Sequence, residues 1–350
     1  MSTSAQNTPL SGRSGIRPRK GLEVRLLARP QGLPAVGDFG VTEVAVPDPA
    51  PGQALVRNLF MSLGPGMLSL VEGKPGLPIP RYEVGEVMYG DAVGEVVASA
   101  DPSLGEGDLV VHRLGWREYA LDRADAFRRV DKDTYPSPSQ HLGSGLVAYA
   151  GLMDAARLRP GDTVFVSSAA GATGSVAGQI ARLKGAARVI GSAGSRDKVD
   201  HLTGTLGFDA AFDHHDGPIA DQLRAAAPDG IDVYFDNVGG EQLRAAIEIM
   251  NPHGRIALCG ALSRQSKAGP DDGPGDLLGV LGKRLTIRGF TVGDHLERAP
   301  EFGAQFRTWL REGAIVYDET VIDGLANAPQ ALLDLVNGAY TGKTVVRLGS

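Results

Sequence analysis

The sequence predicts an α/β protein in which a doubly wound parallel sheet is combined with a smaller all-β domain. From residue 142 onward, apolar strands alternate with amphipathic helices, the pattern of a parallel sheet with crossover helices. Before residue 130, short strands of alternating polarity are separated by Pro- and Gly-rich turns, which indicates a small β barrel or sandwich. A chain of 350 residues has room for two such domains, each with its own core.

Residues 163–185 carry the first functional signal. Residues 163–168 are β-branched and apolar, like a buried parallel strand, and residues 169–174 are small and glycine-rich. Apolar residues then recur at helical spacing up to Gly185. A strand, a glycine turn and a helix form the phosphate cradle of dinucleotide-binding folds, because free N–H groups and the positive helix end face the pyrophosphate. A tight turn without a ligand uses the same residues, so this motif alone leaves both interpretations open.

The alternation of strands and helices extends over the C-terminal half of the chain. We expect strands at 163–168, 188–192, 210–212, 231–237, 255–260 and 285–292, and helices at 145–154, 175–184, 195–206, 218–227, 242–250 and 300–313. Two further strands, 317–322 and 344–348, come too late for the parallel sheet and are expected to return to the first domain. The predicted organisation is a flexible tail over 1–20, a β domain formed by 21–140 and 314–350, and a dinucleotide-binding domain over 141–313.

Charge and cysteine content exclude several classes of function. The formal net charge is −6, and beyond the basic first twenty residues the chain has 31 basic and 41 acidic side chains. An acidic body without a basic stripe argues against nucleic acid as a partner. No apolar run approaches a membrane span and the N-terminus lacks the apolar core of a secretory signal, so we expect a cytoplasmic protein. Cys259 is the only cysteine and the seven histidines show no ligand-like spacing, so no metal is predicted.

The end of the second parallel strand predicts which dinucleotide is bound. In NAD-specific sites an acidic residue about twenty positions after the glycines bonds the ribose 2′-hydroxyl. Here that position is near Gly194, and Ser195, Arg196 and Lys198 follow in place of an acid. A small-residue position with cations beside it suits a 2′-phosphate, which predicts NADP(H). The alternative is an ordinary solvated start of a helix.

Other strand ends predict the nicotinamide side of the same site. In such sheets the carboxyl ends of the strands face the ligand crevice. Asn237 follows the fourth strand, the turn 259–263 follows the fifth, and residues 290–292 end the sixth. We therefore expect these segments to contact the nicotinamide half of the cofactor.

Five motifs together resemble one family of reductases: SSAAGATGSVAGQIARLKG (167–185), GSAGSRDKV (191–199), FDNVGG (235–240), GRIALCGA (254–261) and GKT (342–344). They are similar to the zinc-free medium-chain reductases, in the branch of prostaglandin reductases, leukotriene B4 12-hydroxydehydrogenases and NADP-dependent alkenal double-bond reductases. The resemblance implies a GroES-like catalytic domain beside a Rossmann domain, usually in a homodimer. It also implies NADPH-dependent reduction of the C=C bond of an α,β-unsaturated ketone or aldehyde.

The resemblance assigns cofactor contacts to particular residues. Gly171, Ala172, Thr173 and Gly174 would cradle the pyrophosphate, and Lys198 would bind the 2′-phosphate. His214 stands where the family has a tyrosine near that phosphate. The remaining expected cofactor contacts are Ser195, Arg196, Asn237, Cys259, Ala261, Ser263, Phe290, Val292 and Tyr340.

The departures from the family pattern gather around the substrate. In the run 58–68, Gly64, Gly66 and Leu68 replace an acid, an aromatic residue and a base of the family. Gln265 stands nearest to the place of a tyrosine that many members carry, and Tyr340 replaces an asparagine. These changes should widen and neutralise the substrate pocket, so we expect a bulkier and less charged enone than the lipid aldehydes usual in the family.

The proton donor is the least determined part of the predicted site. Reduction of an enone sends a hydride to the β-carbon and a proton to the α-carbon, and donors near the carbonyl oxygen lower the barrier. Tyr82 is the first candidate for the acid or oxyanion donor and Tyr340 the second. For Tyr82 the alternative is an aromatic side chain packed in the barrel. Quinone or carbonyl reduction without metal, and cofactor binding without redox turnover, remain the rival functions.

Overall fold

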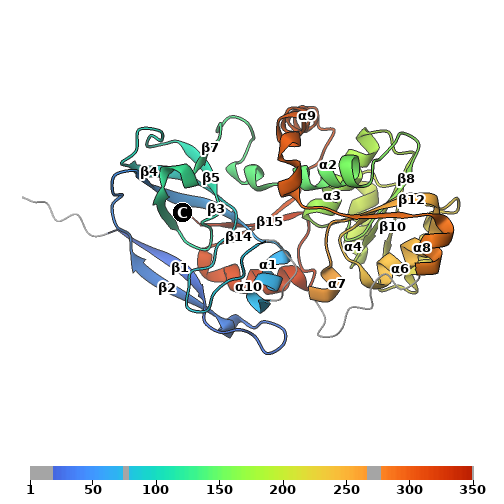
Figure 1. Cartoon of the computed structure of the whole chain (residues 1–350), viewed down its shortest axis with the longest axis horizontal. Coiled ribbons are helices and arrows are strands. Elements are labelled where there is room, and N and C mark those ends of the chain that lie inside the picture. The colour runs from blue at the N-terminus through green and yellow to red at the C-terminus, as the bar shows by residue number, and fades with distance from the viewer. Residues whose placement is uncertain (1–18, 74–78, 266–276, 349–350) are drawn as a thin grey trace, which may run out of the picture.

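A computed structural model describes residues 19–73, 79–265 and 277–348 of the chain. Figure 1 shows two halves side by side, one built mainly of strands and one in which a sheet is covered by helices. Most of the predicted tail and most of the polar segment after Ser263 lie outside the described residues.

The α/β half contains a six-stranded sheet in which every pair is parallel. Its strands are β8 (Thr163–Val166), β9 (Arg188–Ala193), β10 (Ala210–Asp213), β11 (Ile231–Asp236), β12 (Met250–Leu258) and β13 (Thr286–Gly289). They lie in the order β10-β9-β8-β11-β12-β13, so the direction of winding reverses between β8 and β11. This is the strand order of the Rossmann fold, and the predicted fold class is confirmed.

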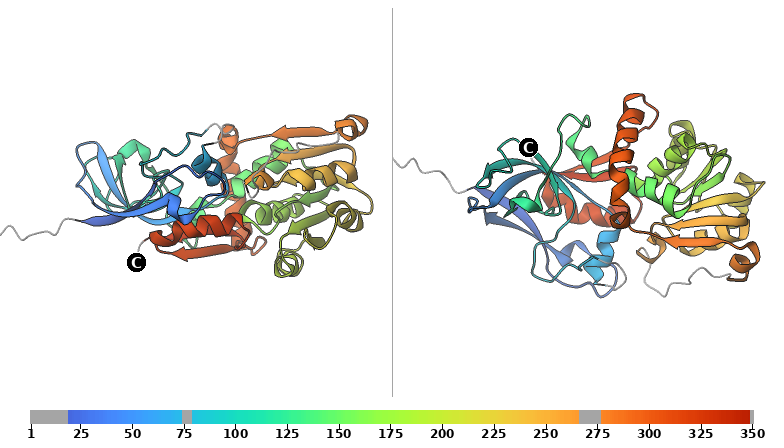
Figure 2. Two further views of the ribbon diagram at one scale, coloured as in Figure 1. Left: turned by 90° about the horizontal axis from the view of Figure 1, so that it is seen from below. Right: turned by 45° about the horizontal axis from the view of Figure 1, so that its top comes forward.

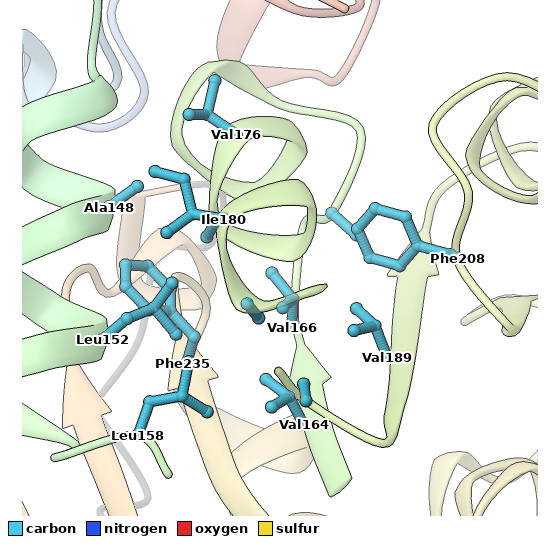
Figure 3. Close-up of a cluster of buried hydrophobic side chains, with 14 of the residues drawn as sticks. Ala148, Leu152, Leu158, Val164, Val166, Val176, Ile180, Val189, Phe208 and Phe235 are labelled. Atoms are coloured by element: carbon cyan, nitrogen blue, oxygen red, sulfur yellow. The ribbon is translucent and has the colours of Figure 1, made fainter. Parts of the chain in front are cut away.

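Helices cover both faces of this sheet, as Figure 2 shows from two further directions. The helices of this half are α2 (Gly145–Ala150), the π-helix η4 (Gly151–Ala155), α3 (Ala172–Leu183), α4 (Arg196–Gly204), α5 (Ile219–Ala226), α6 (Gly240–Ile249), α7 (Leu262–Gln265), α8 (Leu277–Lys283), the 3-10 helix η5 (Val292–Arg298) and α9 (Ala299–Arg311). In Figure 3, Val176 and Ile180 of α3 pack with Leu152, Val166 and Phe235. Each such aliphatic side chain stabilises the fold by roughly 1.5–3 kcal/mol when fully buried. This packing fixes the direction in which α3 points.

The β half is organised around its longest strand, β3 (Gln53–Ser62). One edge of β3 pairs with β4, and the other is shared by β6 and β15. The remaining strands and helices of this half are β1 (Lys20–Leu26), η1 (Val36–Asp38), β2 (Phe39–Ala45), α1 (Gly66–Glu72), β4 (Ala92–Ser99), β5 (Leu109–His112), β6 (Tyr119–Arg123), η2 (Ala124–Ala126), β7 (Arg128–Arg129), η3 (Pro138–Leu142), β14 (Glu319–Asp323), η6 (Leu325–Asn327), α10 (Ala328–Val336) and β15 (Lys343–Arg347). The last two strands of the chain therefore join the sheet that contains β3.

The segment before β15 connects the two halves. In Figure 1, β15 lies between the strand-rich half and α3. The N–H of Gly342 donates to the carbonyl of Ala170 at 2.8 Å, and Gly342 forms an isolated bridge with Gly171. Gly342 has a φ of 69°, and a Cβ there would lie 2.3 Å from the carbonyl oxygen of Asp318. Only glycine fits this position, on grounds of both conformation and space.

Several element boundaries differ from the sequence-based expectation: β12 begins at Met250 and not at residue 255, and β13 ends at Gly289 and not at residue 292. Helix α3 begins at Ala172 and not at residue 175, so half of the glycine-rich stretch is the first helical turn. The helix expected at 145–154 is α-helical only to Ala150 and continues as η4. A π-turn shares the apolar spacing of an α-helix closely enough that periodicity alone does not separate them. Among the described residues, no helix is both long and apolar enough to cross a membrane.

Candidate functional site

The turn between β8 and α3 is built to leave backbone N–H groups free. Ser168, two residues after the end of β8, has a left-handed conformation with a φ of 48°. Gly171 is the N-cap of α3 and offers no side chain to cap it, so the first N–H groups of the helix have no intrahelical partner. A Cβ on Gly174 would lie 2.3 Å from the carbonyl oxygen of Ser168, which requires glycine there. Ala172 and Thr173 lie within this first turn, and the arrangement fits a pyrophosphate.

Two cations predicted to bind the 2′-phosphate, Arg196 and Lys198, follow the end of β9. Ser195 is the N-cap of α4, and its hydroxyl accepts from the N–H of Lys198 at 3.4 Å. The Lys198 ammonium is half-buried and donates to the carbonyl of Gly338 at 2.6 Å, and burial lowers its pKa. Arg196 behaves differently: its side chain is 79% exposed and pairs with Asp200. Of the two predicted cations, Lys198 is therefore the ordered one.

A pair of histidines covers Gly194. The His214 ring lies with Nδ1 2.6 Å from the carbonyl oxygen of Ala193, and its Cε1 is 3.1 Å from where a Cβ on Gly194 would stand. His215 packs on it with ring centroids 4.0 Å apart and bonds Asp213 through Nδ1 at 2.9 Å. The ring of His214 thus lies next to Gly194, the position where the sequence predicted the binding site of the 2′-phosphate.

Two groups of potential metal ligands occur among the described residues. One is Asp213 with His214 and His215, and the other is Asp154 with His295 and Glu297. In the first, both Nδ1 atoms are already in short contacts within the protein. In the second, Asp154 is paired with Arg298 at 2.6 Å and with His295 at 3.1 Å. Neither group includes a residue of the turn between β8 and α3, which is called the cofactor turn below.

Asp236 organises the nicotinamide side, and sequence reasoning gave it no role. It ends β11 and is fully buried, and its Oδ1 accepts from the Tyr234 hydroxyl at 2.7 Å and from the N–H groups of Val238 and Gly239. Burial raises the pKa of this carboxyl, and these hydrogen bonds act in the opposite direction. An acid at the end of an apolar strand, directly before an Asn-x-Gly-Gly turn, is the signal that could have revealed it.

The turns that follow β11 and β12 are held against each other. The Asn237 side chain donates to the Ser167 carbonyl at 2.7 Å, and the N–H of Ser263 donates to the Val238 carbonyl at 3.0 Å. The N–H of Cys259 bonds the carbonyl of Asp236 at 2.8 Å. Burial raises the pKa of the Cys259 thiol to about 12, so the thiol stays protonated and is not a nucleophile.

The other segments expected on this side lie at the same edge of the sheet. Ala261 is exposed in the turn between Cys259 and α7. The Phe290 ring stands edge-on to Phe235 with centroids 6.4 Å apart, and Val292 begins η5. The carboxyl ends of β8, β11, β12 and β13 therefore bring together the segments that the sequence predicted for the nicotinamide half.

The residues predicted for the substrate divide into two groups. A Cβ on Gly64 or Gly66 would meet nothing within 4 Å, so the side chains missing there leave open space. Helix α1, which begins at Gly66, lies against α7 of the other half, whose last residue is Gln265. Leu68 is buried in the hydrophobic core of the β half.

The two candidate tyrosines differ in burial. Tyr82 is buried in the core of the β half, and its hydroxyl donates to the Tyr89 carbonyl at 2.8 Å. Burial raises its pKa well above the ordinary value. Tyr340 is half-buried, two residues before Gly342, and its hydroxyl donates to Oδ2 of Asp334 at 3.2 Å. Burial and the Asp334 carboxylate raise its pKa as well. The geometry of Tyr82 favours the packing role that the sequence left open.

Comparison with known proteins matches both halves of the chain. A family model described as the N-terminal domain of oxidoreductase matches residues 23–130, and one described as zinc-binding dehydrogenase matches residues 172–307. The NADPH-dependent curcumin reductase of Escherichia coli (strain K12) is 38% identical over 332 residues, covering 92% of this chain and 95% of the relative. The 2-alkenal reductase (NADP(+)-dependent) of Nicotiana tabacum is 36% identical over 325 residues, covering 90% and 94%.

A solved structure agrees with these relatives. The crystal structure of CurA in complex with NADPH from Vibrio vulnificus matches with a TM-score of 0.86 at 37% identity, covering 94% of this chain and 99% of that one. The fold and the glycine turn thus define an oxidoreductase that uses NADP(H). The chain belongs to the zinc-free medium-chain dehydrogenase/reductase family, which the five motifs indicated.

Proposed function

We propose that this enzyme reduces the C=C bond of an α,β-unsaturated ketone or aldehyde with NADPH. The observation that carries the proposal is a relative named curcumin reductase and another named 2-alkenal reductase, each matching at least 90% of the chain. Both names describe the reduction of conjugated carbonyl compounds by the same cofactor. The cofactor turn of this chain supports that assignment, because its glycine requirement and its lysine fit NADP(H).

In the proposed reaction, bound NADPH supplies a hydride to the β-carbon of the enone. The chain contributes position and charge. The free N–H groups at the start of α3 would hold the pyrophosphate of the cofactor, and the ammonium of Lys198 would hold its 2′-phosphate. The turns anchored by Asp236 orient the nicotinamide end, since their backbone is fixed before any ligand arrives.

The proton for the α-carbon is assigned to Tyr340 in this proposal. Tyr340 is half-buried, and its neighbour Gly342 contacts the cofactor turn through Ala170. A hydroxyl with a raised pKa keeps its proton at neutral pH, as a donor must. Tyr82 is less accessible, because its ring is buried in the core of the β half.

The substrate is proposed to be bulkier and less charged than a short linear alkenal. Support comes from the open space at Gly64 and Gly66, where the family carries an acid and an aromatic ring. Removing a charge and a ring from one turn leaves a wider and more neutral surface beside α7.

A substrate panel tests the proposed function. The purified chain is mixed with NADPH and either bulky cyclic or diaryl enones, short 2-alkenals, quinones, or saturated aldehydes, and NADPH absorbance and products are followed. Saturated ketone from a bulky enone, at a higher kcat/KM than from any short alkenal, is the expected result. Best turnover with short alkenals would contradict the bulky-substrate assignment. Turnover of quinones or saturated aldehydes alone would show a different reductase, and NADPH binding without turnover a binding protein.

A homodimer in the cytoplasm completes the proposal. Strand β13 is the last strand of the parallel sheet, and the preceding α8 exposes Leu277, Leu278 and Leu281 by 66%, 79% and 73%. A second copy that pairs β13 with its own β13 would cover these leucines. Sedimentation of the wild type as a dimer, and of Leu281→Asp as a monomer, is expected; a monomeric wild type contradicts it. The single cysteine suits a reducing compartment, and cell fractionation tests the location.

A further inference from the structure

One buried cation, Lys343, has no role in the site described so far. It begins β15, and its side chain is buried inside the β half. Its Nζ donates to the hydroxyl of Ser62 at 2.5 Å. Within the described part of the chain, the bond to Ser62 is the one hydrogen bond of the Lys343 side chain, and Lys343 forms no ion pair there.

Burying this ammonium costs stability. Desolvation lowers the pKa of Lys343 to about 8, and the carboxylates of Asp91 and Glu319 oppose that shift only in part. Replacing a poorly paired buried charge by an apolar side chain of similar size is often neutral or stabilising. Packing therefore does not explain why a lysine stands at this position. The hydrogen bond to Ser62 does explain it.

That partner stands at the start of the turn predicted to face the substrate. Ser62 ends β3, and the next N–H, of Leu63, donates to the Thr344 carbonyl at 3.1 Å. Beyond these anchors the turn runs through Gly64 to Gly66, where open space begins. The turn is thus fixed to β15 at one end, and at its other end it leads into α1.

The same stretch of chain also contacts the cofactor turn. Gly342 donates to Ala170, and Lys343 follows it directly. Its own N–H donates to the Asp318 carbonyl at 2.8 Å, so the backbone at Lys343 is held independently of its side chain. A change confined to the side chain should leave the cofactor turn as it is.

We propose that Lys343 is a positioning residue for the substrate: its ammonium holds Ser62 and thereby sets the turn 62–66 relative to the cofactor turn. This inference rests on the proposed function for the identity of the substrate. It assigns to Lys343 an effect on the enone and none on NADPH.

The experiment compares Lys343→Met and Ser62→Ala, singly and together, with Lys184→Met as the control. Lys184 also donates to one side chain, Gln305 at 2.6 Å, but lies at the end of α3 outside the site. Each of the two site variants should raise the KM for the enone about tenfold or more, since small displacements of a positioned substrate are costly. The NADPH Kd should stay within about twofold, because the backbone that contacts the cofactor turn is held independently of the Lys343 side chain.

Two further measurements separate positioning from structural support. The KM of the double variant for the enone should be no higher than that of the more affected single variant, because both substitutions remove the same hydrogen bond. The melting temperature of Lys343→Met should equal or exceed that of the wild type. Losses that multiply in the double variant, or a fall in stability together with NADPH affinity, would overturn the inference.

Hydrogen exchange keeps the test independent of the substrate. Amides of residues 62–72 should exchange faster in both site variants than in the wild type and in Lys184→Met. If the wild type reduces no enone, the proposed function fails while this readout still decides the role of Lys343. Unchanged exchange in this segment would show that the ammonium does not fix the turn.

Discussion

Two glycines, Gly174 in the cofactor turn and Gly66 in the turn predicted to face the substrate, have opposite physical meanings. A Cβ on Gly174 would collide with backbone at 2.3 Å, whereas a Cβ on Gly66 would meet nothing within 4 Å. The first glycine is required by a site made of backbone, which recognises a cofactor through its N–H groups. The second marks a side chain that is absent from a site made of side chains. The cofactor half is therefore constrained by the fold, and the substrate half is free to differ.

The largest expected effect breaks the constrained side. In Gly174→Ala, the new methyl group forces the start of α3 away from Ser168, so the N–H groups lose their common focus. We expect the Kd for NADPH to rise about 100-fold or more, which is close to 3 kcal/mol of binding free energy. Calorimetry on the purified chain measures it, with circular dichroism to show that the variant is folded.

Gly204→Ala is the matched control for this change. Gly204 is the last residue of α4, and a Cβ there meets nothing within 4 Å. Its NADPH affinity should equal that of the wild type. A Gly174→Ala affinity within about threefold of the wild type would show that the turn tolerates a side chain after all.

The second prediction concerns the charge at the 2′-phosphate. Lys198→Ala should lower the preference for NADPH over NADH by about 10- to 100-fold, the size of a lost hydrogen bond to a charged group. Arg196→Ala removes an equal charge two residues away, but that side chain is exposed and paired with Asp200. Its effect should stay within about twofold. Equal effects of the two changes on the ratio of Kd values would mean that long-range charge, and not the ordered lysine, selects the cofactor.

Much of the cofactor half could be predicted from the sequence, because its signals are local. A β-branched run, a glycine turn and helical spacing lie in one stretch, and the missing acid near Gly194 is visible without a structure. The doubly wound parallel sheet followed from the alternation of strands and helices. The start of α3 was misplaced, because glycine at position 174 suggested a turn where close packing requires it inside a helix.

The contacts that the sequence could not show are those between distant residues. Lys343 and Ser62 are 281 positions apart, and no periodicity links them. Asp236 accepts hydrogen bonds from the turn that follows it and from Tyr234. The sequence does not show these bonds, because they depend on the burial of the strand end. The sequence left Tyr82 open as a proton donor or a packed aromatic side chain, because its burial depends on how the β half closes around it.

The third prediction concerns the open space at Gly66, in the turn predicted to face the substrate. Gly66→Tyr restores a ring at a position with free space, so the fold should tolerate it. The kcat/KM for bulky enones should fall about tenfold or more through lost fit, while that for short alkenals should change little. Gly66→Ala is the graded control and should change neither by more than about twofold. A parallel loss for short and bulky substrates would mean that this turn does not determine substrate size.

The smallest expected effect is that of Tyr82→Phe. The change removes the hydrogen bond to the Tyr89 carbonyl from a buried hydroxyl and leaves the ring in place. Stability should fall by about 1 kcal/mol, the net value of one hydrogen bond, and kcat should remain within about threefold of the wild type. Tyr340→Phe, compared in the same assay, should lower kcat by about tenfold or more, as expected for a general acid. A tenfold or larger fall in kcat for Tyr82→Phe, with an unchanged melting temperature, would return the proton donor to the core of the β half.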